Sequence, residues 1–387
     1  MIVNLSRSDF TKGVKTAMTC VKKNPTNYIM KTILVETLDS STISFSGNST
    51  DIGVIIKLPA SVLEPGSFCI DGETASKIAM ALPSTKEEVV LEMKDTDSVL
   101  IKCGKAKQTV PVFKGEEFVK VDGGQKGKAP IEVPTDEAVF LDCLKVLKPF
   151  LSFQNTGAVM MRSMLLKTSG SSAILLATDG KELCRVSATL FPEGTQIESE
   201  AAIPSEHITA VMRTLDGKVG SDFRILFYPD ATRLVFTKKT FDEEIYIRVS
   251  LFAEKYPDIA GVIPKQYEMS LQFDKNELKD AVVRASNFIN DKGMNAVVLD
   301  IKENEVANVS VNTSLGNYSE DVAVTPVECK CKPLRLGFDP KFMLDMIGAQ
   351  ISDDMVLNFI SNRAPVTSML NATVAEIFLL IMPVNIR

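Results

Sequence analysis

The sequence predicts an α+β protein made of three similar domains. Six segments with a helical pattern of apolar residues each begin at a residue that favours a helix N-terminus, and long β-rich stretches follow them. The predicted N-caps are Ser8, Asp71, Thr135, Ser205, Asp274 and Asp339. Alternate caps recur roughly every 130 residues, and the two caps within each domain lie roughly 65 residues apart. Each domain therefore consists of two copies of a smaller unit, a helix followed by strands.

Two of these helix starts carry an additional signal. Pro340 follows Asp339 at the first helical position, where proline is favoured, and Asp274 forms a capping-box pattern with Glu277. The segments between the helices contain runs typical of strands, at residues 42–46, 172–176, 233–236 and 296–301. Sheets are therefore expected to dominate the fold.

Two junctions divide the chain. Residues 122–130 are polar and rich in glycine, which is typical of a linker, and residues 256–264 contain two prolines within a short segment. The predicted domains are residues 1–128, 129–259 and 260–387.

Composition and charge exclude several classes of protein. The chain has 387 residues, of which 45% are hydrophobic and 24% charged, as in an ordinary globular protein. No apolar run approaches the roughly 20 residues of a membrane span, and residues 1–7 lack the pattern of a secretory signal. We therefore expect a cytoplasmic protein with no membrane partner. The net charge of −6 argues against a protein coated in basic residues.

Cysteine and histidine usage argues against a metal or cofactor site. The seven cysteines are scattered, and only Cys329 and Cys331 lie close together, without a second pair or a histidine nearby to complete a zinc site. We interpret all seven as reduced thiols. The single histidine, His207, excludes a site with several histidine ligands.

The predicted helices have one apolar face and one that carries basic residues. In the first helix, Phe10, Val14 and Ala17 share a face, whereas Lys12, Lys15 and Lys22 lie on the opposite one. The other helices repeat this design more weakly with Lys77, Lys145, Arg213 and Lys341. Such faces are often merely solvated. If several of them faced one axis, they would attract phosphates without reading bases.

Motifs for catalysis are missing from the sequence. Gly127 and Lys128 fail the phosphate-binding loop pattern, because Ala129 stands where Ser or Thr is required and Asp122 where glycine is required. The acidic pairs at 87–88, 242–243 and 353–354 are local, with no companion residues for acid/base chemistry. We therefore expect a protein that is not an enzyme.

Three segments carry a family resemblance. Residues 176–183 (LATDGKEL), 256–264 (YPDIAGVIP) and 381–387 (IMPVNIR) resemble, in order and spacing, motifs of the bacterial DNA polymerase III beta subunit, the DNA sliding clamp family. The resemblance extends over the whole chain, because residues 24–26 and 336–339 also resemble family segments.

The resemblance implies a DNA-clamp fold, in which each domain packs two helices against antiparallel sheets and two subunits join head to tail in a ring. It implies a processivity factor that encircles double-stranded DNA without sequence preference. It also implies a pocket between the second and third domains that binds short linear peptides of the replicative polymerase, the clamp loader and repair proteins.

The resemblance also implies the site residues. The DNA-facing positions are Lys12, Lys15, Lys22, Lys23, Asn24, Lys77, Lys145, Lys148 and Arg213. The partner-peptide pocket comprises Met160, Met161, Thr178, Gly180, Lys181, Glu182, Leu183, Pro257, Val262, Leu380, Met382, Pro383 and Val384. The dimer interface comprises Val110, Phe288 and Ile289.

The chain departs from the family pattern at several positions. Asn24 stands where the family often has arginine in a DNA-facing loop, which weakens the expectation of a DNA contact there. Glu182 and Gly261 also stand where arginine is usual, so a less basic pocket is expected. Asn385 and Gln108 also depart from the pattern, the latter at a position that can hold a large apolar residue. A β-rich binding or adhesion module without a DNA role is the competing class, and the lysine stripe of the first helix argues against it.

Overall fold

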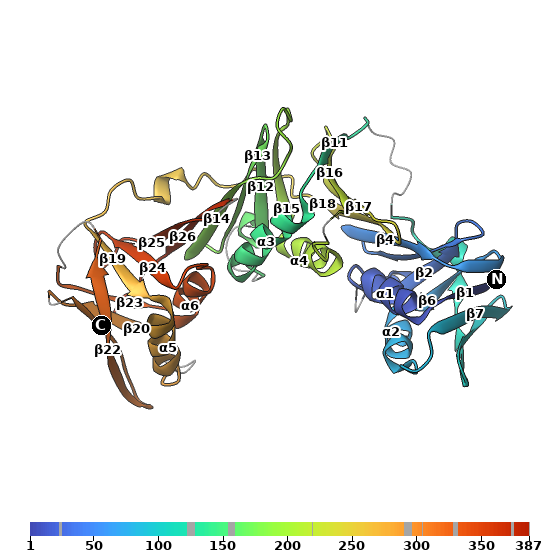
Figure 1. Cartoon of the computed structure of the whole chain (residues 1–387), viewed down its shortest axis with the longest axis horizontal. Helices are drawn as coiled ribbons and strands as arrows, with labels where there is room; N and C mark the ends of the chain where they lie inside the picture. The colour runs from blue at the N-terminus through green and yellow to red at the C-terminus, as the bar shows by residue number, and fades with distance from the viewer. Residues whose placement is uncertain are drawn as a thin grey trace. The chain divides into compact units, whose positions relative to one another are not determined.

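The structure is a computed structural model that describes the 387-residue chain except for residues 23–24, 122–127, 154–158, 219, 290–295, 304, 328–331, 373–374 and 387. The described residues form six α-helices and three antiparallel sheets, which confirms the predicted α+β class (Figure 1). The helices are α1 (Arg7–Met18), α2 (Gly72–Ala81), α3 (Glu137–Leu147), α4 (Ser205–Thr214), α5 (Lys275–Ser286) and α6 (Pro340–Gly348). Short 3-10 helices are η1 (Tyr28–Lys31), η2 (Gly115–Glu117), η3 (Lys148–Phe150), η4 (Val159–Arg162) and η5 (Ala260–Val262).

Three of the predicted N-caps are confirmed. The side chains of Asp71, Asp274 and Asp339 each accept a hydrogen bond from a backbone N–H in the first turn of α2, α5 and α6. Each carboxylate also lies at the positive end of its helix dipole, which stabilises the start of the helix.

The other three starts are shifted by one or two residues. α1 begins at Arg7 and is capped by Ser6, whose hydroxyl accepts from the N–H of Asp9, so the prediction of Ser8 is wrong. α3 begins after Asp136, which accepts from the N–H of Val139 and takes the capping position predicted for Thr135. α4 begins at Ser205 itself.

Residues 1–141, 191–195 and 206–253 form one compact unit, which contains two sheets. The five-stranded sheet has the order β5 (Ser61–Glu64), β1 (Ile2–Ser6), β7 (Glu88–Asp95), β8 (Ser98–Cys103) and β9 (Ala106–Pro111). The nine-stranded sheet has the order β10 (Phe113–Lys114), β6 (Ser67–Asp71), β2 (Thr32–Thr37), β3 (Thr42–Asn48), β4 (Ile52–Pro59), β18 (Glu244–Ser250), β17 (Arg233–Lys239), β16 (Asp222–Phe227) and β11 (Ile131–Pro134).

Helix α1 packs beside α2 and lies on β3 and β4 (Figure 1). Phe10, Val14 and Ala17 are buried in this contact, as the helical pattern predicted. Gly47 of β3 allows the close approach, because a Cβ atom there would collide with the backbone carbonyl of Ala17.

Residues 142–190, 196–205 and 254–387 form the second compact unit, around one sheet of twelve strands. Its order is β15 (Glu198–Pro204), β12 (Ser163–Ser169), β13 (Ser172–Thr178), β14 (Glu182–Thr189), β26 (Ala375–Ile381), β25 (Val366–Asn371), β24 (Asp354–Phe359), β19 (Met269–Asp274), β22 (Gly316–Pro326), β21 (Val306–Thr313), β20 (Val297–Ile301) and β23 (Leu334–Phe338).

Hydrogen-bonded strands cross both predicted domain boundaries. β4 pairs with β18 in register from Ile52 opposite Val249 to Lys57 opposite Glu244. β14 pairs with β26 from Glu182 opposite Ile381 to Ala188 opposite Ala375. Each junction is thus a continuous sheet, in which the backbone groups of two edge strands satisfy each other.

Five cysteines, namely Cys20, Cys69, Cys103, Cys143 and Cys184, are buried free thiols, whereas Cys329 and Cys331 lie outside the described residues. Among the helices that the structure describes, none is long and apolar enough to cross a membrane.

Candidate functional sites

Most of the predicted DNA-facing residues are exposed on helices or directly after them. Exposed basic side chains are Lys15 on α1, Lys22 after it, Lys77 on α2, Lys145 on α3, Lys148 in η3 and Arg213 on α4. Two of them have acidic neighbours, since Lys22 lies 4.0 Å from Asp51 and Lys145 lies 2.8 Å from Asp142. Both pairs are exposed to solvent and bind their lysines weakly. Lys23 and Asn24 lie outside the described residues.

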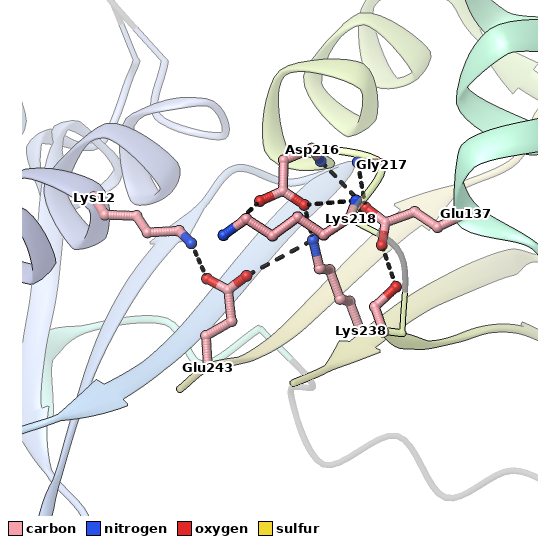
Figure 2. A network of polar contacts seen from close by, with 8 residues as sticks. Lys12, Glu137, Asp216, Gly217, Lys218, Lys238 and Glu243 are labelled. Atoms are coloured by element: carbon pink, nitrogen blue, oxygen red, sulfur yellow. Dashed lines mark hydrogen bonds and ion pairs between the residues drawn. The ribbon is translucent and has the colours of Figure 1, made fainter. Parts of the chain in front are cut away.

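Lys12 differs from the other lysines of this set. Its ammonium group forms an ion pair with the carboxylate of Glu243, in the turn between β17 and β18 (Figure 2). The side chain of Glu243 is only 3% exposed, so this pair is partly withdrawn from water. Lys12 therefore has a structural partner that competes with any phosphate.

Glu243 belongs to a network centred on Lys238 of β17 (Figure 2). The Lys238 side chain is 1% exposed, and its Nζ contacts Glu137 at 3.1 Å, Glu243 at 3.7 Å and Asp216. Burial alone lowers the pKa of Lys238, but hydrogen bonds to Asp216 and Glu137 outweigh it and raise the pKa. Lys238 therefore stays charged at neutral pH.

Glu137, the first residue of α3, ties this network to the end of α4. One of its carboxylate oxygens accepts from the backbone N–H groups of Asp216, at 3.1 Å, and of Gly217, at 3.0 Å. The other accepts from the hydroxyl of Ser221 at 2.5 Å. Through Glu137, Asp216 and the Lys12–Glu243 pair, one buried cation connects α1, the start of α3 and the loop after α4. Sequence analysis did not find this network, because its members are far apart in the chain.

Apolar residues of the predicted partner-peptide pocket come together on one face of the twelve-stranded sheet. Leu183 of β14 stands opposite Thr178 of β13 on one side and Leu380 of β26 on the other, and directly opposed residues project to the same face. All three are buried. Val262, in η5, is 53% exposed and is the most accessible apolar side chain of the set.

The loop between β13 and β14 holds this face in place. The hydroxyl of Thr178 accepts from the N–H of Gly180, at 3.0 Å, and donates to the carbonyl of Glu182, at 2.6 Å. Gly180 has a φ of +89°, which favours glycine, and it is exposed together with Lys181.

The C-terminal segment is attached to this loop and to β23. The N–H of Met382 donates to the carbonyl of Lys181 at 2.8 Å, and the N–H of Val384 donates to the carbonyl of Gly337 at 2.8 Å. Met161, Pro257, Met382, Pro383 and Val384 are half-buried, and Met160 is buried in η4, which packs on β12 and β13.

Glu182 does not share the face of Leu183. It stands opposite Ile381, and successive strand residues alternate between faces. Its side chain is 2% exposed, and one oxygen accepts from Nζ of Lys341 in α6 at 2.9 Å. The second oxygen has no hydrogen-bond partner among the described residues. The expected acidic contribution of Glu182 to the peptide face is therefore not supported, because its charge is buried on the other side of the sheet.

Burial has a strong effect on Glu182. It raises the pKa of this carboxyl from 4.5 to about 7, although the ammonium group of Lys341 opposes the shift. Lys341 also pairs with Asp345 at 2.6 Å, so two carboxylates share one cation. Protonation of Glu182 near neutral pH would leave Lys341 with Asp345 alone.

The predicted dimer residues lie on two different parts of the chain. Val110 is half-buried on β9, which is an edge strand of the five-stranded sheet. Phe288 and Ile289 follow α5 and are also half-buried, and the ring of Phe288 stacks on Tyr318 with centroids 6.2 Å apart. Each of the three thus leaves part of its apolar surface accessible.

Comparisons with known proteins agree with this fold. One family model, described as the DNA polymerase III beta subunit N-terminal domain, matches residues 1–122, and another, the C-terminal domain of the same subunit, matches residues 260–385. The beta sliding clamp of Salmonella typhimurium is 23% identical over 333 residues, covering 84% of each chain. That of Staphylococcus aureus is 21% identical over 379 residues, covering 94% of each chain. The crystal structure of the DNA polymerase sliding clamp from Bacillus subtilis superposes with a TM-score of 0.85 at 22% identity and full coverage of both chains.

The two family models together match more than half of the chain and the relatives cover most of it, so the fold and the sequence define one class, the DNA clamp. The chain belongs to the bacterial DNA polymerase III beta subunit family, the beta sliding clamps, which are non-catalytic processivity factors.

The substitution Lys238→Met tests the buried network. We expect it to lower the free energy of unfolding by about 3 to 5 kcal/mol, because Glu137 would remain buried without its cation and Glu243 would keep only Lys12. Denaturant unfolding at neutral pH measures the change. The control is Lys239→Met, the same substitution at the exposed next residue, which should change stability by less than about 0.5 kcal/mol. Equal stability of the two variants would show that the network contributes nothing.

The pKa of Glu182 predicts a pH dependence of stability. The folded-state value of about 7 exceeds the ordinary 4.5, so the folded protein binds the proton more tightly than the unfolded chain does. The free energy of unfolding should therefore fall as pH rises from 4.5 to 7, by on the order of 3 kcal/mol. Glu182→Gln cannot ionise and should lack this decrease. Unfolding of both proteins across that pH range is the measurement, and parallel profiles would refute the assignment.

Proposed function

We propose that two copies of this chain close head to tail into a ring that encircles duplex DNA and tethers the replicative polymerase, the clamp loader and repair proteins. Membership of the sliding clamp family supports the proposal. The observation that carries it is the set of exposed basic side chains on or directly after α1 to α4, in a chain whose net charge is −6. Other exposed lysines lie on strands and loops, so the support comes from the recurrence of basic residues on successive helices.

Contact with DNA is proposed for Lys15, Lys22, Lys77, Lys145, Lys148 and Arg213, together with Lys23 and Asn24, which the structure does not describe. Lysine and arginine contacts with phosphate are electrostatic and independent of sequence. We assign Lys12 a weaker contact with DNA, because the carboxylate of Glu243 already compensates its charge. Few contacts on an acidic protein favour retention by ring closure rather than by affinity.

Ring closure is proposed to join the first domain of one copy to the third domain of the other. β9 offers an unpaired strand edge that carries Val110, and Phe288 and Ile289 supply apolar surface. We retain the three domains at residues 1–128, 129–259 and 260–387 as the units of this assembly. The continuous sheets β4–β18 and β14–β26 would then be the two junctions within each copy.

The partner-peptide pocket is proposed on the sheet face of Thr178, Leu183 and Leu380, with Pro257, Val262 and Met382 around it. Apolar sites with a few polar groups are common ligand sites, and methionine adapts to several partners. Two apolar anchors at about 1.5 to 3 kcal/mol each, together with backbone hydrogen bonds to the peptide, suggest micromolar rather than nanomolar affinity for an isolated peptide, so partners could exchange on the ring.

Retention on DNA tests the ring. After loading by an ATP-driven clamp loader, the protein should stay on nicked circular DNA in high salt and be lost once the DNA is linearised, because a closed ring leaves only over an end. Gel filtration of labelled protein with DNA is the measurement. The control carries Phe288→Asp and Ile289→Asp, and we expect it to be monomeric and not retained. Equal salt sensitivity on circular and linear DNA would contradict the proposal.

Peptide binding tests the pocket. Val262→Asp should weaken binding of a fluorescent clamp-binding peptide at least tenfold, because one anchor contact of roughly 1.5 to 3 kcal/mol is lost at an exposed side chain that the fold does not need. Leu183→Asp should abolish binding, but Leu183 is 2% exposed, so this variant requires a check of folding. Ile351→Asp, at an exposed apolar residue after α6, is the control. Fluorescence anisotropy measures the affinity, and unchanged binding by Val262→Asp would argue against the pocket.

A further inference from the structure

A cavity of about 430 Å³ lies in the second unit, between one face of the sheet and the segment of residues 255–263. Strands β12, β13, β14 and β15 form its floor, and the segment that includes η5 forms its roof. Its volume falls within the range of sites that bind small ligands. Its lining residues are Leu165, Lys167, Ile174, Leu176, Arg185, Glu200, Lys255, Tyr256, Pro257, Asp258, Ile259, Ala260 and Ile263.

This cavity lies on the same face of the sheet as the proposed partner-peptide pocket. Leu176 stands two residues before Thr178 on β13, and Arg185 stands two residues after Leu183 on β14. Leu176 and Arg185 are directly opposite each other, so they form the next row of side chains on that face, about 7 Å along the strands. Pro257 belongs to both the cavity lining and the predicted pocket. The cavity therefore continues the pocket along the sheet.

The floor and roof of the cavity are apolar. Leu165, Ile174 and Leu176 form the floor, and Ile259 and Ile263 lie in the roof. An unbranched polar side chain would gain little binding free energy in this cavity. A branched or aromatic side chain would bury apolar surface against both the floor and the roof.

The charged groups at the cavity are mostly compensated within the protein. Lys167 pairs with Glu200 directly across β12 and β15 at 2.5 Å. Arg185 pairs with Glu376 at 3.1 Å and lies 5.3 Å from the ring centroid of Phe378. A charged ligand group at Lys167 or Arg185 would have to displace one of these partners. Lys255 and Asp258 also line the cavity but are exposed to solvent, so the apolar floor and roof favour an uncharged occupant.

One polar group in the lining lacks a partner. Tyr256 is only 7% exposed, and its hydroxyl has no hydrogen-bond partner among the described residues. A buried hydroxyl is usually hydrogen-bonded, either within the protein or to a ligand or water. An acceptor supplied by an occupant of the cavity, such as a peptide carbonyl, would satisfy this hydroxyl.

We propose that this cavity is a second compartment of the partner-peptide pocket, which takes an uncharged branched or aromatic side chain of the same linear peptide. The inference rests on the proposed function, because it assumes that a peptide occupies the face of Leu183. It adds a specificity determinant: partners with a further apolar residue beyond their anchor residues bind more tightly than partners without one.

Peptides of two lengths test the proposal on the full-length protein. The short probe carries two adjacent leucines as its only apolar residues, and two longer probes add Ile-Gly-Leu before or after them. We expect one longer probe to bind roughly tenfold more tightly than the short one, as about 1.4 kcal/mol of added burial would give. It should also shift the methyl resonances of Ile174 and Ile263, which the short probe should leave unchanged.

Filling the cavity should remove this gain. Ala260→Trp places a large side chain at an exposed lining position, and it should bring the longer probe to the affinity of the short one while leaving the short one unaffected. Ala253→Trp is the matched control, because Ala253 is exposed and does not line the cavity, and it should retain the gain.

The outcomes separate this inference from the proposed function. If all probes bind the protein equally and the Ile174 methyl does not respond, the second compartment is wrong and the pocket stands. If the short probe fails to bind but a longer one still shifts Ile174, the cavity is a peptide site and the face of Leu183 is wrong. If no probe binds, both are overturned.

Discussion

Pairing between strands that are distant in the sequence is the constraint on which the rest of this structure depends. A lone strand edge leaves backbone N–H and C=O groups without partners, and β14 and β26 remove two such edges by pairing with each other. That pairing places Leu380 beside Leu183 and brings the C-terminal segment to the loop at Lys181. The candidate pocket therefore exists only because the last strand of the chain joins a sheet begun far earlier.

Much of this architecture could be predicted from local sequence. Helix starts at Asp71, Asp274 and Asp339 were correct because a capping carboxylate and the turn it stabilises lie within three residues of each other. The predicted start of α1 was wrong because Ser6 and Ser8 are chemically equal capping candidates. Strand β1 ends at Ser6, so the helix begins directly after it and Ser6 becomes the cap.

The site was harder to predict, because its determinants are not local. The position of Glu182 within a family motif indicated a residue of the peptide face, but strand alternation turns its side chain towards Lys341 of α6. Lys12 had the spacing of a solvated stripe, yet its partner Glu243 lies in a turn of the next predicted domain. Neither contact produces a repeating pattern of residues that sequence analysis could detect. Pairings of this kind become visible only when the tertiary structure brings the two segments together.

The open edge of β9 bears on the accuracy of the proposed association between copies of this chain. Any extended segment can add to a free strand, in several registers, unless the edge itself discriminates. Pro111, at the end of β9, has no N–H to donate, so the pairing surface stops there. Lys107, exposed near the other end, disfavours a strand that would bury it. The composition of one short strand thus limits misassembly while leaving a few central residues free for the correct neighbour.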